Sequence, residues 1–201
     1  MTAFVFDIGN VLLRWDPRNL YRKIFREETE MDWFLAHVCD GPWNEEQDRG
    51  RSWSDAIAER TARFPDWQHQ IRAYDERWFE MLAGEITENV QLLSSLKKAG
   101  KRTYAITNFS REKFAVARSH FEFFDFFNGI VVSGEECLMK PDVRIFKRFL
   151  ERYRLEAQEC IFIDDNSRNV AAARSLGMSA IHYQEPLNLA RALAECGVEL
   201  G

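Results

Sequence analysis

The chain has 201 residues, of which 46% are hydrophobic and 29% charged, and its formal net charge is −5. These values are ordinary for a globular protein with one sizeable core and room for a smaller companion domain. No run of about 18 apolar residues is present, so we expect no membrane-spanning helix and no membrane partner. The negative charge argues against nucleic-acid binding, which depends on Lys and Arg side chains that neutralise phosphates.

The N-terminus and the cysteines favour a cytoplasmic protein. The first three residues lack the basic region that begins a secretory signal, and the short apolar run after them contains Asp7. The cysteines are widely spaced and form no C-x-x-C pair, which favours reduced thiols over a disulfide framework or a zinc site. They are Cys39, Cys137, Cys160 and Cys196.

The first predicted element is a buried strand over residues 3–7, within the stretch "FVFDIGNVL". It ends at Asp7 and runs directly into the turn signal Gly9-Asn10. A strand that presents a carboxylate at a glycine turn indicates a reactive site. It also poses a question, because the residue two positions after this carboxylate has no side chain.

The composition changes after this strand. All six tryptophans lie between residues 15 and 78, and residues 16–88 hold 17 Asp and Glu against 10 Lys and Arg, a local charge of −7. Apolar residues recur there at three- and four-residue spacing, as in Tyr74, Trp78 and Leu82. We therefore expect a small helical domain over 16–88, with helices at 18–26, 31–38, 54–64 and 68–82.

From residue 89 onward, strands and helices alternate. Gly100 and Gly177 each follow a predicted helix directly, where a left-handed C-cap residue is favoured. The alternation predicts an α/β fold, with a five-stranded parallel sheet in a core of residues 1–15 and 89–201. Its later strands are expected at 103–107, 130–133, 160–164 and 179–183, and its helices at 89–99, 111–121, 142–153, 167–176 and 186–196.

Reactive side chains follow four of the five strands, at the sheet edge where ligands bind in parallel sheets. Each has a plain explanation by itself, since an Asp after a strand is often a helix cap and a Thr-Asn pair is commonly a turn. Their occurrence together, in strand order, indicates one site. The set is Asp7, Thr107, Asn108, Lys140, Asp164, Asp165 and Asn169.

These residue types suit metal-assisted phosphoryl transfer. Asp7 and Asp164 supply the hard oxygen ligands that Mg²⁺ prefers, and Asp165 and Asn169 are spaced to face one point at a helix start. Lys140 adds a cation that neutralises Asp7 and a phosphoryl oxygen. Thr107 offers a hydroxyl and Asn108 a backbone N–H to the same anion. Asp7 would be the nucleophile that forms an aspartyl-phosphate.

At these residues the sequence resembles the haloacid dehalogenase-like (HAD) hydrolases over essentially the whole chain. "FDIGNVL", "ITN", "KPD" and "FIDDNSRN" resemble the four motifs of the family in order. The resemblance implies Asp7 as nucleophile, Thr107 and Lys140 as phosphate-holding residues and Asp164 as a Mg²⁺ ligand. It places Asp165 and Asn169 in the metal-supporting positions, and residues 16–88 where subfamily I members carry a helical C1 cap.

One position departs from the family pattern. Family phosphatases usually have a second Asp two residues after the nucleophile, which acts as general acid and base, but here that residue is Gly9. The resemblance implies that Gly9 still binds the metal through its backbone carbonyl. The D-x-G-N-V pattern resembles that of bacterial members acting on glucose 1-phosphate.

The loss of this acid favours a substrate whose leaving oxygen depends little on protonation, such as a sugar 1-phosphate rather than a 6-phosphate. A cap carboxylate, Glu45 or Asp48, or simply water would otherwise supply the proton.

The leading hypothesis is thus a Mg²⁺-dependent phosphatase of a small phosphorylated metabolite. A metal-independent dehalogenase is the first alternative, against which the adjacent carboxylates of "FIDDN" count. The second is a phospho-ligand-binding protein that has lost activity, with Gly9 as the lesion.

The substrate should be selected by the polar cap stretch "GPWNEEQDRGRSW", which reads equally well as a solvated loop or a helix end. On the sharper interpretation Trp43 walls the pocket, and Glu45, Asp48 or Arg49 reaches the substrate. Asp16 is expected to cap the first cap helix. The sequence leaves the oligomeric state open.

Overall fold

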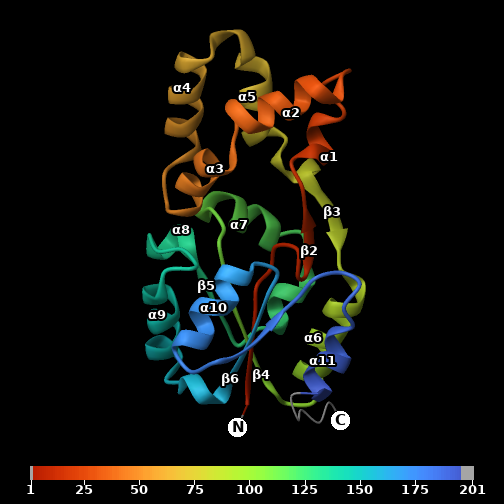
Figure 1. Cartoon of the computed structure of the whole chain (residues 1–201), viewed down its shortest axis with the longest axis vertical. Helices are drawn as coiled ribbons and strands as arrows, with labels where there is room; N and C mark the ends of the chain where they lie inside the picture. The colour runs from red at the N-terminus through yellow and green to blue at the C-terminus, as the bar shows by residue number, and fades with distance from the viewer. Residues whose placement is uncertain (1, 196–201) are drawn as a thin grey trace.

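A computed structural model describes residues 2–195 and contains a five-stranded parallel sheet in the order β5-β4-β1-β6-β7 (Figure 1). The predicted α/β fold is confirmed, and each predicted strand lies within one residue of its expected bounds. The strands are β1 (Ala3–Phe6), β4 (Arg102–Thr107), β5 (Gly129–Val132), β6 (Cys160–Asp164) and β7 (Ser179–His182).

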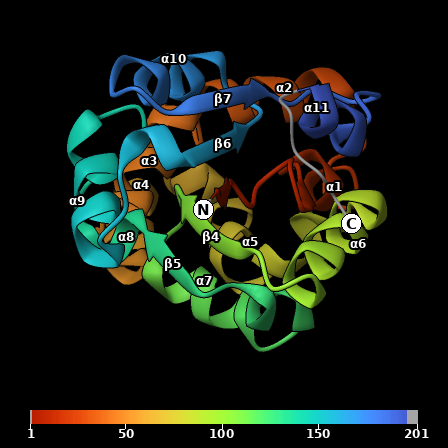
Figure 2. The ribbon, with the colours of Figure 1, turned by 90° about the horizontal axis from the view of Figure 1, so that it is seen from below.

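Helices cover both faces of this sheet (Figure 2). Ala3 and Val5 point into one apolar cluster, while Phe4 and Phe6 point into the other, because successive strand residues face opposite sides. Burial on both faces explains why the strands read as continuous apolar runs. The first face is covered by α9 (Val143–Tyr153) and α10 (Ser167–Ser175), and the second by α6 (Thr87–Lys98), α7 (Arg111–Arg118) and α11 (Leu189–Glu195).

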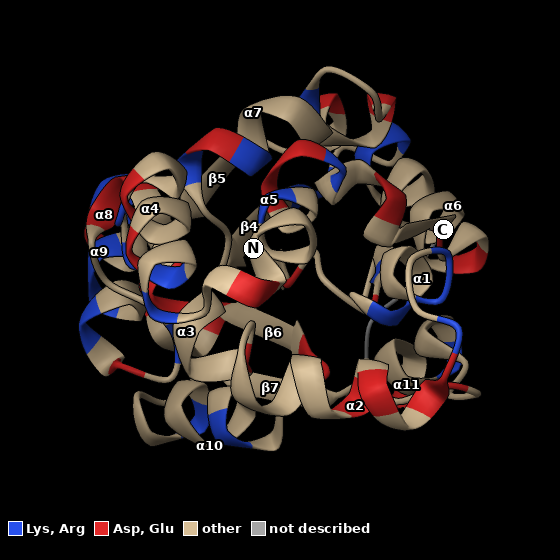
Figure 3. Ribbon diagram, turned by 90° about the horizontal axis from the view of Figure 1, so that it is seen from above, with Lys and Arg blue, Asp and Glu red and all other residues tan. Residues whose placement is uncertain are grey.

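A group of helices lies above the carboxyl edge of the sheet and forms the cap (Figure 1). Its interior is aromatic: Tyr21 packs on Phe34 with ring centroids 4.9 Å apart, and Trp53 stacks on Tyr74 at 5.5 Å. Seen from above, α2 is predominantly acidic, whereas both signs of charge alternate over α4 (Figure 3). The cap helices are α1 (Arg18–Tyr21), α2 (Glu28–His37), α3 (Gly41–Asp48), α4 (Trp53–Arg63) and α5 (Gln68–Glu76).

An antiparallel ribbon joins the cap to the core, and the sequence did not predict it. β2 (Leu13–Trp15) pairs with β3 (Leu82–Glu85), which lie far apart in the chain. The helix expected over 68–82 ends at Glu76, and a 3₁₀ turn over Trp78–Met81 leads into β3. The pairing with β2 therefore overrides the helical periodicity. The ribbon lies beside the expected domain boundaries at 15/16 and 88/89, which remain a prediction.

The first cap helix and the polar stretch after it also differ from the expectation. The helix expected over 18–26 spans only Arg18–Tyr21, and Asp16 Oδ1 accepts a hydrogen bond of 2.8 Å from the Arg18 amide at its start. Residues 41–48 form α3 rather than a loop. The Asp40 side chain caps this helix by accepting from the Trp43 amide at 2.9 Å, with a proline in the first turn.

The remaining local predictions concern caps, thiols and membrane helices. Gly100 and Gly177 have φ of +70° and +91°, so both left-handed C-caps are confirmed. Cys39, Cys137 and Cys160 are free thiols. Cys196, at the end of the last predicted helix, lies outside the described residues. Within residues 2–195, no helix is long and apolar enough to cross a membrane.

The packing under α9 supplies a test of the fold. Phe146 is fully buried, and its ring meets Phe162 of β6 edge-on at 5.2 Å. We expect Phe146→Ala to lower the free energy of unfolding by about 3–5 kcal/mol, because it leaves a cavity in the core. Urea denaturation measures this. Val116→Ala, at a side chain that is 39% exposed, is the control, and equal effects of the two substitutions would contradict this packing.

Candidate active site

A buried lysine links the carboxylates of two neighbouring strands. Asp7 directly follows β1, and Asp164 ends β6, which pairs with β1. The Lys140 ammonium lies 2.9 Å from Asp7 Oδ1 and 2.7 Å from Asp164 Oδ2. The three residues are at most 7% exposed. The strand-end residues predicted to meet are therefore in direct contact.

Asp164 is further fixed by groups at the start of α10. Asn169 Nδ2 donates to Asp164 Oδ1 and Oδ2 at 3.0 and 3.1 Å, and the Asn166 amide donates to Oδ1 at 2.8 Å. Asn166 also caps α10 by accepting from the Arg168 amide at 3.0 Å. Asn169 thus contacts Asp164 directly, as expected for a residue that orients a metal-binding carboxylate.

The loop that carries Lys140 is held by a side chain from the end of β4. Asn108 Nδ2 donates to the Lys140 carbonyl at 2.9 Å, and Asn108 Oδ1 accepts from the Lys140 amide at 2.8 Å. These two hydrogen bonds engage both the N–H and the C=O of Lys140, as a neighbouring β-strand would, and they fix the position of its backbone. The side chain of Asn108 therefore positions Lys140, a function that the sequence did not reveal.

Thr107 ends β4 beside Asp7 and has an unsatisfied hydroxyl. The residue is 1% exposed, and its Oγ1 is buried with no hydrogen-bond partner. Leaving a buried polar group unpaired costs free energy, so an orphan hydroxyl at a strand end is suited to an external anion.

The carboxylates form a site that fits a divalent cation. Oxygens of Asp7, Asp164 and Asp165 all lie within 4.8 Å of one another. Three carboxylates carry a charge of −3 when ionised, and Lys140 compensates only one of these charges. The remaining charge and the all-oxygen donor set fit Mg²⁺, which takes carboxylate ligands.

The titration of these groups follows from burial and mutual repulsion. Burial raises the pKa of Asp7 to about 8, with Lys140 opposing the shift and Asp164 and Asp165 adding to it. Burial, then Asp164, raises the pKa of Asp165. Burial alone would lower the pKa of Lys140, but Asp164 and Asp7 outweigh it and raise the pKa. A bound cation would lower the pKa of the carboxyl groups, as Lys140 does for Asp7, and so favour their ionised forms.

The turn after β1 brings the chain back across the site. The Ile8 amide donates to Asp7 Oδ1 at 2.7 Å, and Asn10 adopts a left-handed φ of +52°. Gly9 then forms a β-bridge with Leu13, and both residues line a pocket. A Cβ at Gly9 would meet no atom within 4 Å. Backbone crowding therefore does not require this glycine.

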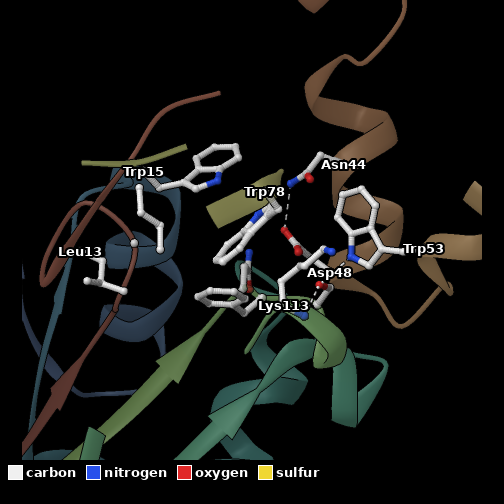
Figure 4. Close-up of a pocket in the computed structure, with 12 residues that line it drawn as sticks. Leu13, Trp15, Asn44, Asp48, Trp53, Trp78 and Lys113 are labelled. Atoms are coloured by element: carbon white, nitrogen blue, oxygen red, sulfur yellow. Dashed lines mark hydrogen bonds between the residues drawn. The ribbon is translucent and has the colours of Figure 1, made fainter. Parts of the chain in front are cut away.

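The pocket lies between the turn, the ribbon and the cap (Figure 4). Figure 4 shows Leu13 and Trp15 on one side of it and Asn44, Asp48 and Trp53 on the other. Its polar residues include Asn108 and Ser110 from the loop after β4 and Lys113 from α7. Its apolar lining is Leu13, Trp15, Trp53, Trp78, Leu82 and Phe109.

Of the four cap residues expected to reach the substrate, only Asp48 lines this pocket. Trp43 is 2% exposed, and its ring packs edge-on against Tyr74 at 5.1 Å, so it belongs to the interior of the cap. Glu45 and Arg49 form a surface ion pair at 3.7 Å. The face of α3 that carries Asn44 and Asp48 is turned toward the pocket, and this orientation corrects the expectation for Trp43.

Contacts between the cap and α7 were missed by the sequence reasoning. The Trp53 indole N–H donates to Ser110 Oγ at 2.9 Å, and the Lys113 ammonium bonds the Asp75 carbonyl at 2.8 Å. Ser110 also caps α7. A serine directly before a predicted helix is a common N-cap, so this role of Ser110 had a local signal. Nothing in the sequence paired Trp53 or Asp75 with the start of α7.

Comparison with known proteins agrees with this geometry. Residues 1–177 match the model of the haloacid dehalogenase-like hydrolases. The chain belongs to this family. It is similar to a sesquiterpene phosphatase from Aspergillus oryzae, at 28% identity over 92% of this chain and 91% of the relative. The chain is a hydrolase with the HAD-like α/β fold.

Two solved structures show the same fold. A wild-type HAD family enzyme from Bacteroides thetaiotaomicron, in complex with magnesium and inorganic phosphate, has a TM-score of 0.74 at 21% identity, over 96% of this chain and 98% of that one. A dehalogenase has a TM-score of 0.67 at 18% identity, over 94% of this chain and 87% of the other.

The carboxylate cluster predicts that Mg²⁺ stabilises the protein. A ligand that binds only the folded state adds about 2.7 kcal/mol at 100 times its Kd, so we expect Mg²⁺ to raise Tm. Asp164→Asn should shift this effect to higher Mg²⁺ concentration, because it removes an anionic ligand. Thermal unfolding across a Mg²⁺ series measures both, with Glu46→Gln on the surface of α3 as control. An unchanged titration in Asp164→Asn would identify Asp165 as the direct ligand.

Proposed function

We propose that this hydrolase is a Mg²⁺-dependent phosphatase that acts through an aspartyl-phosphate intermediate on Asp7. The observation that carries the proposal is the buried contact of Lys140 with Asp7 and Asp164, next to Asp165 and the unpaired Thr107 hydroxyl. A carboxylate, a cation and an unsatisfied donor at the ends of neighbouring strands support phosphoryl transfer, which needs positioning and charge neutralisation.

Each residue has a distinct role in this proposal. Asp7 attacks phosphorus, while Thr107 donates to a phosphoryl oxygen and Lys140 neutralises its charge. The Asn108 backbone N–H is a further donor to the anion. Mg²⁺, held by Asp7, Asp164, Asp165 and the Gly9 carbonyl, would neutralise charge on the phosphoryl group when bound. Asn169 keeps Asp164 in place.

The two alternative functions fit the site less well. Metal-independent dehalogenation has no use for three carboxylates within 4.8 Å of one another. A protein that only binds a phosphorylated ligand has no use for a nucleophile held beside a buried lysine.

The pocket bears on the substrate class. Its polar side chains already have partners within the protein: Asn108 bonds Lys140, Ser110 bonds Trp53, Lys113 bonds Asp75, and Asn44 bonds Asp48. The pocket therefore offers few free polar contacts to a substrate. Burying a sugar would leave several hydroxyls unpaired, at a cost in free energy. The six apolar side chains instead favour a leaving group with hydrocarbon surface.

We therefore propose a terpenoid or similar apolar monophosphate as the first substrate class, a choice that the relative from Aspergillus oryzae also supports. A sugar 1-phosphate is the second class, supported by the D-x-G-N-V pattern. In either case residues 16–88 are proposed to act as the C1-type cap that selects the substrate.

The nucleophile assignment gives a direct test. We expect Asp7→Asn to abolish phosphate release, because the amide lacks the nucleophilic charge of the carboxylate. The measurement is phosphate release from 4-nitrophenyl phosphate with Mg²⁺ and with EDTA, in the wild type and in Asp7→Asn. Metal-independent halide release, or turnover by Asp7→Asn at the wild-type rate, would refute the proposed function.

The substrate class is tested separately. We expect farnesyl monophosphate to have a higher kcat/KM than glucose 1-phosphate, and glucose 6-phosphate the lowest value of the three, because the pocket offers apolar contacts and few free polar ones. Trp78→Ala should reduce kcat/KM for farnesyl monophosphate more than for glucose 1-phosphate. A preference for glucose 1-phosphate in the wild type would favour the second class.

A further inference from the structure

Gly9 leaves a proton-donor position empty beside the nucleophile. The glycine lines the pocket two residues after Asp7, and a side chain there would meet no atom within 4 Å. An alcohol leaves phosphorus as an alkoxide unless a proton reaches its oxygen as the bond breaks. If the substrate is an alkyl phosphate, this proton comes from water or from another group that faces the same pocket.

Asp48 is the acidic side chain among the residues that line the pocket. It is the last residue of α3 and extends from the cap toward the loop after β4. The backbone of Ser110 donates a hydrogen bond to its carboxylate, and Asn44 Nδ2 donates to Oδ2 at 3.3 Å. These contacts hold the carboxyl group at the pocket wall, where Figure 4 shows Asp48 beside Asn44.

The surroundings of Asp48 suit a proton donor. Burial raises the pKa of Asp48 to about 7, while the Ser110 backbone opposes the shift and Glu45 adds to it. Lys113 lines the same pocket, but its ammonium is bound to the carbonyl and carboxylate of Asp75. A general acid is most effective when its pKa lies near the working pH.

We propose that Asp48 protonates the departing oxygen of the substrate, in place of the acid that is missing at Gly9. This inference rests on the proposed phosphatase function. Glu45, the other cap carboxylate considered, does not line the pocket and pairs with Arg49 at the surface. The cap thereby takes part in catalysis, because the carboxyl group of Asp48 comes from α3 whereas the nucleophile belongs to the core.

The two half-reactions balance as follows. Asp7 forms a bond to phosphorus while the bond from phosphorus to the leaving oxygen breaks, and that oxygen takes the proton of Asp48. The products are an alcohol, an aspartyl-phosphate and the Asp48 carboxylate. Water then attacks phosphorus and gives a proton to Asp48, and the bond to Asp7 breaks. This step releases phosphate and restores both carboxyl groups.

The test compares two leaving groups of similar size in the first turnover with Mg²⁺. 4-Nitrophenol leaves readily without a proton, whereas 4-nitrobenzyl alcohol does not. We expect Asp48→Asn to slow first-turnover release of 4-nitrobenzyl alcohol at least ~100-fold, as for loss of a general acid, and to leave release of 4-nitrophenol unchanged. Glu46→Gln, at an exposed position of α3, should change neither rate.

Gly9→Asp provides a rescue experiment, since its side chain would enter open space in the same pocket. Added to Asp48→Asn, it should restore the release of 4-nitrobenzyl alcohol. The amplitude of the 4-nitrophenol burst counts folded, active sites, so a folding defect is separated from slow chemistry. Equal slowing of both leaving groups, or of neither, would overturn the role of Asp48. Absence of 4-nitrophenol release from the wild type would instead refute the phosphatase function.

Discussion

The buried ammonium of Lys140 is the interaction on which the site depends. It joins Asp7 to Asp164 in an interior where an unpaired charge is costly, and removal of one partner from such a pair typically costs about 3–5 kcal/mol. Asn169 and the Asn166 amide satisfy the remaining oxygens of Asp164. Because the lysine compensates only one of three neighbouring carboxylates, the ionised cluster keeps a net negative charge that fits a dication.

The core and the cap contribute different parts of the site. The parallel sheet places Asp7, Thr107 and Asp164 at one edge, and Asn108 clamps the loop that brings Lys140 to them. The ribbon β2/β3 carries the cap over this edge, and Trp53 and Asp75 contact the start of α7. The carboxylate cluster and Lys140 thus come from the core, whereas the walls of the pocket come largely from the cap and the ribbon.

Short sequence patterns were enough to predict an element where its burial fixes the order of apolar and polar residues. The apolar runs predicted all five strands of the sheet, and Gly100 and Gly177 marked helix ends correctly. Local signals failed in the cap, where residues 82–85 form a strand because Leu13–Trp15 lies beside them. They also missed α3, whose polar composition conceals a helix with a capping Asp40 and a proline in its first turn.

The sequence by itself determined the α/β sheet and the residues at its carboxyl edge, because a strand end is a local feature and parallel strands bring their ends together. Only the tertiary structure decided that Asp48, and not Trp43, Glu45 or Arg49, faces the pocket. The reason is that packing of Trp43 against Tyr74 and Trp53 sets the rotation of α3. That rotation depends on Trp53 and Tyr74, which lie outside α3 in the helices α4 and α5, so no local pattern in α3 encodes it.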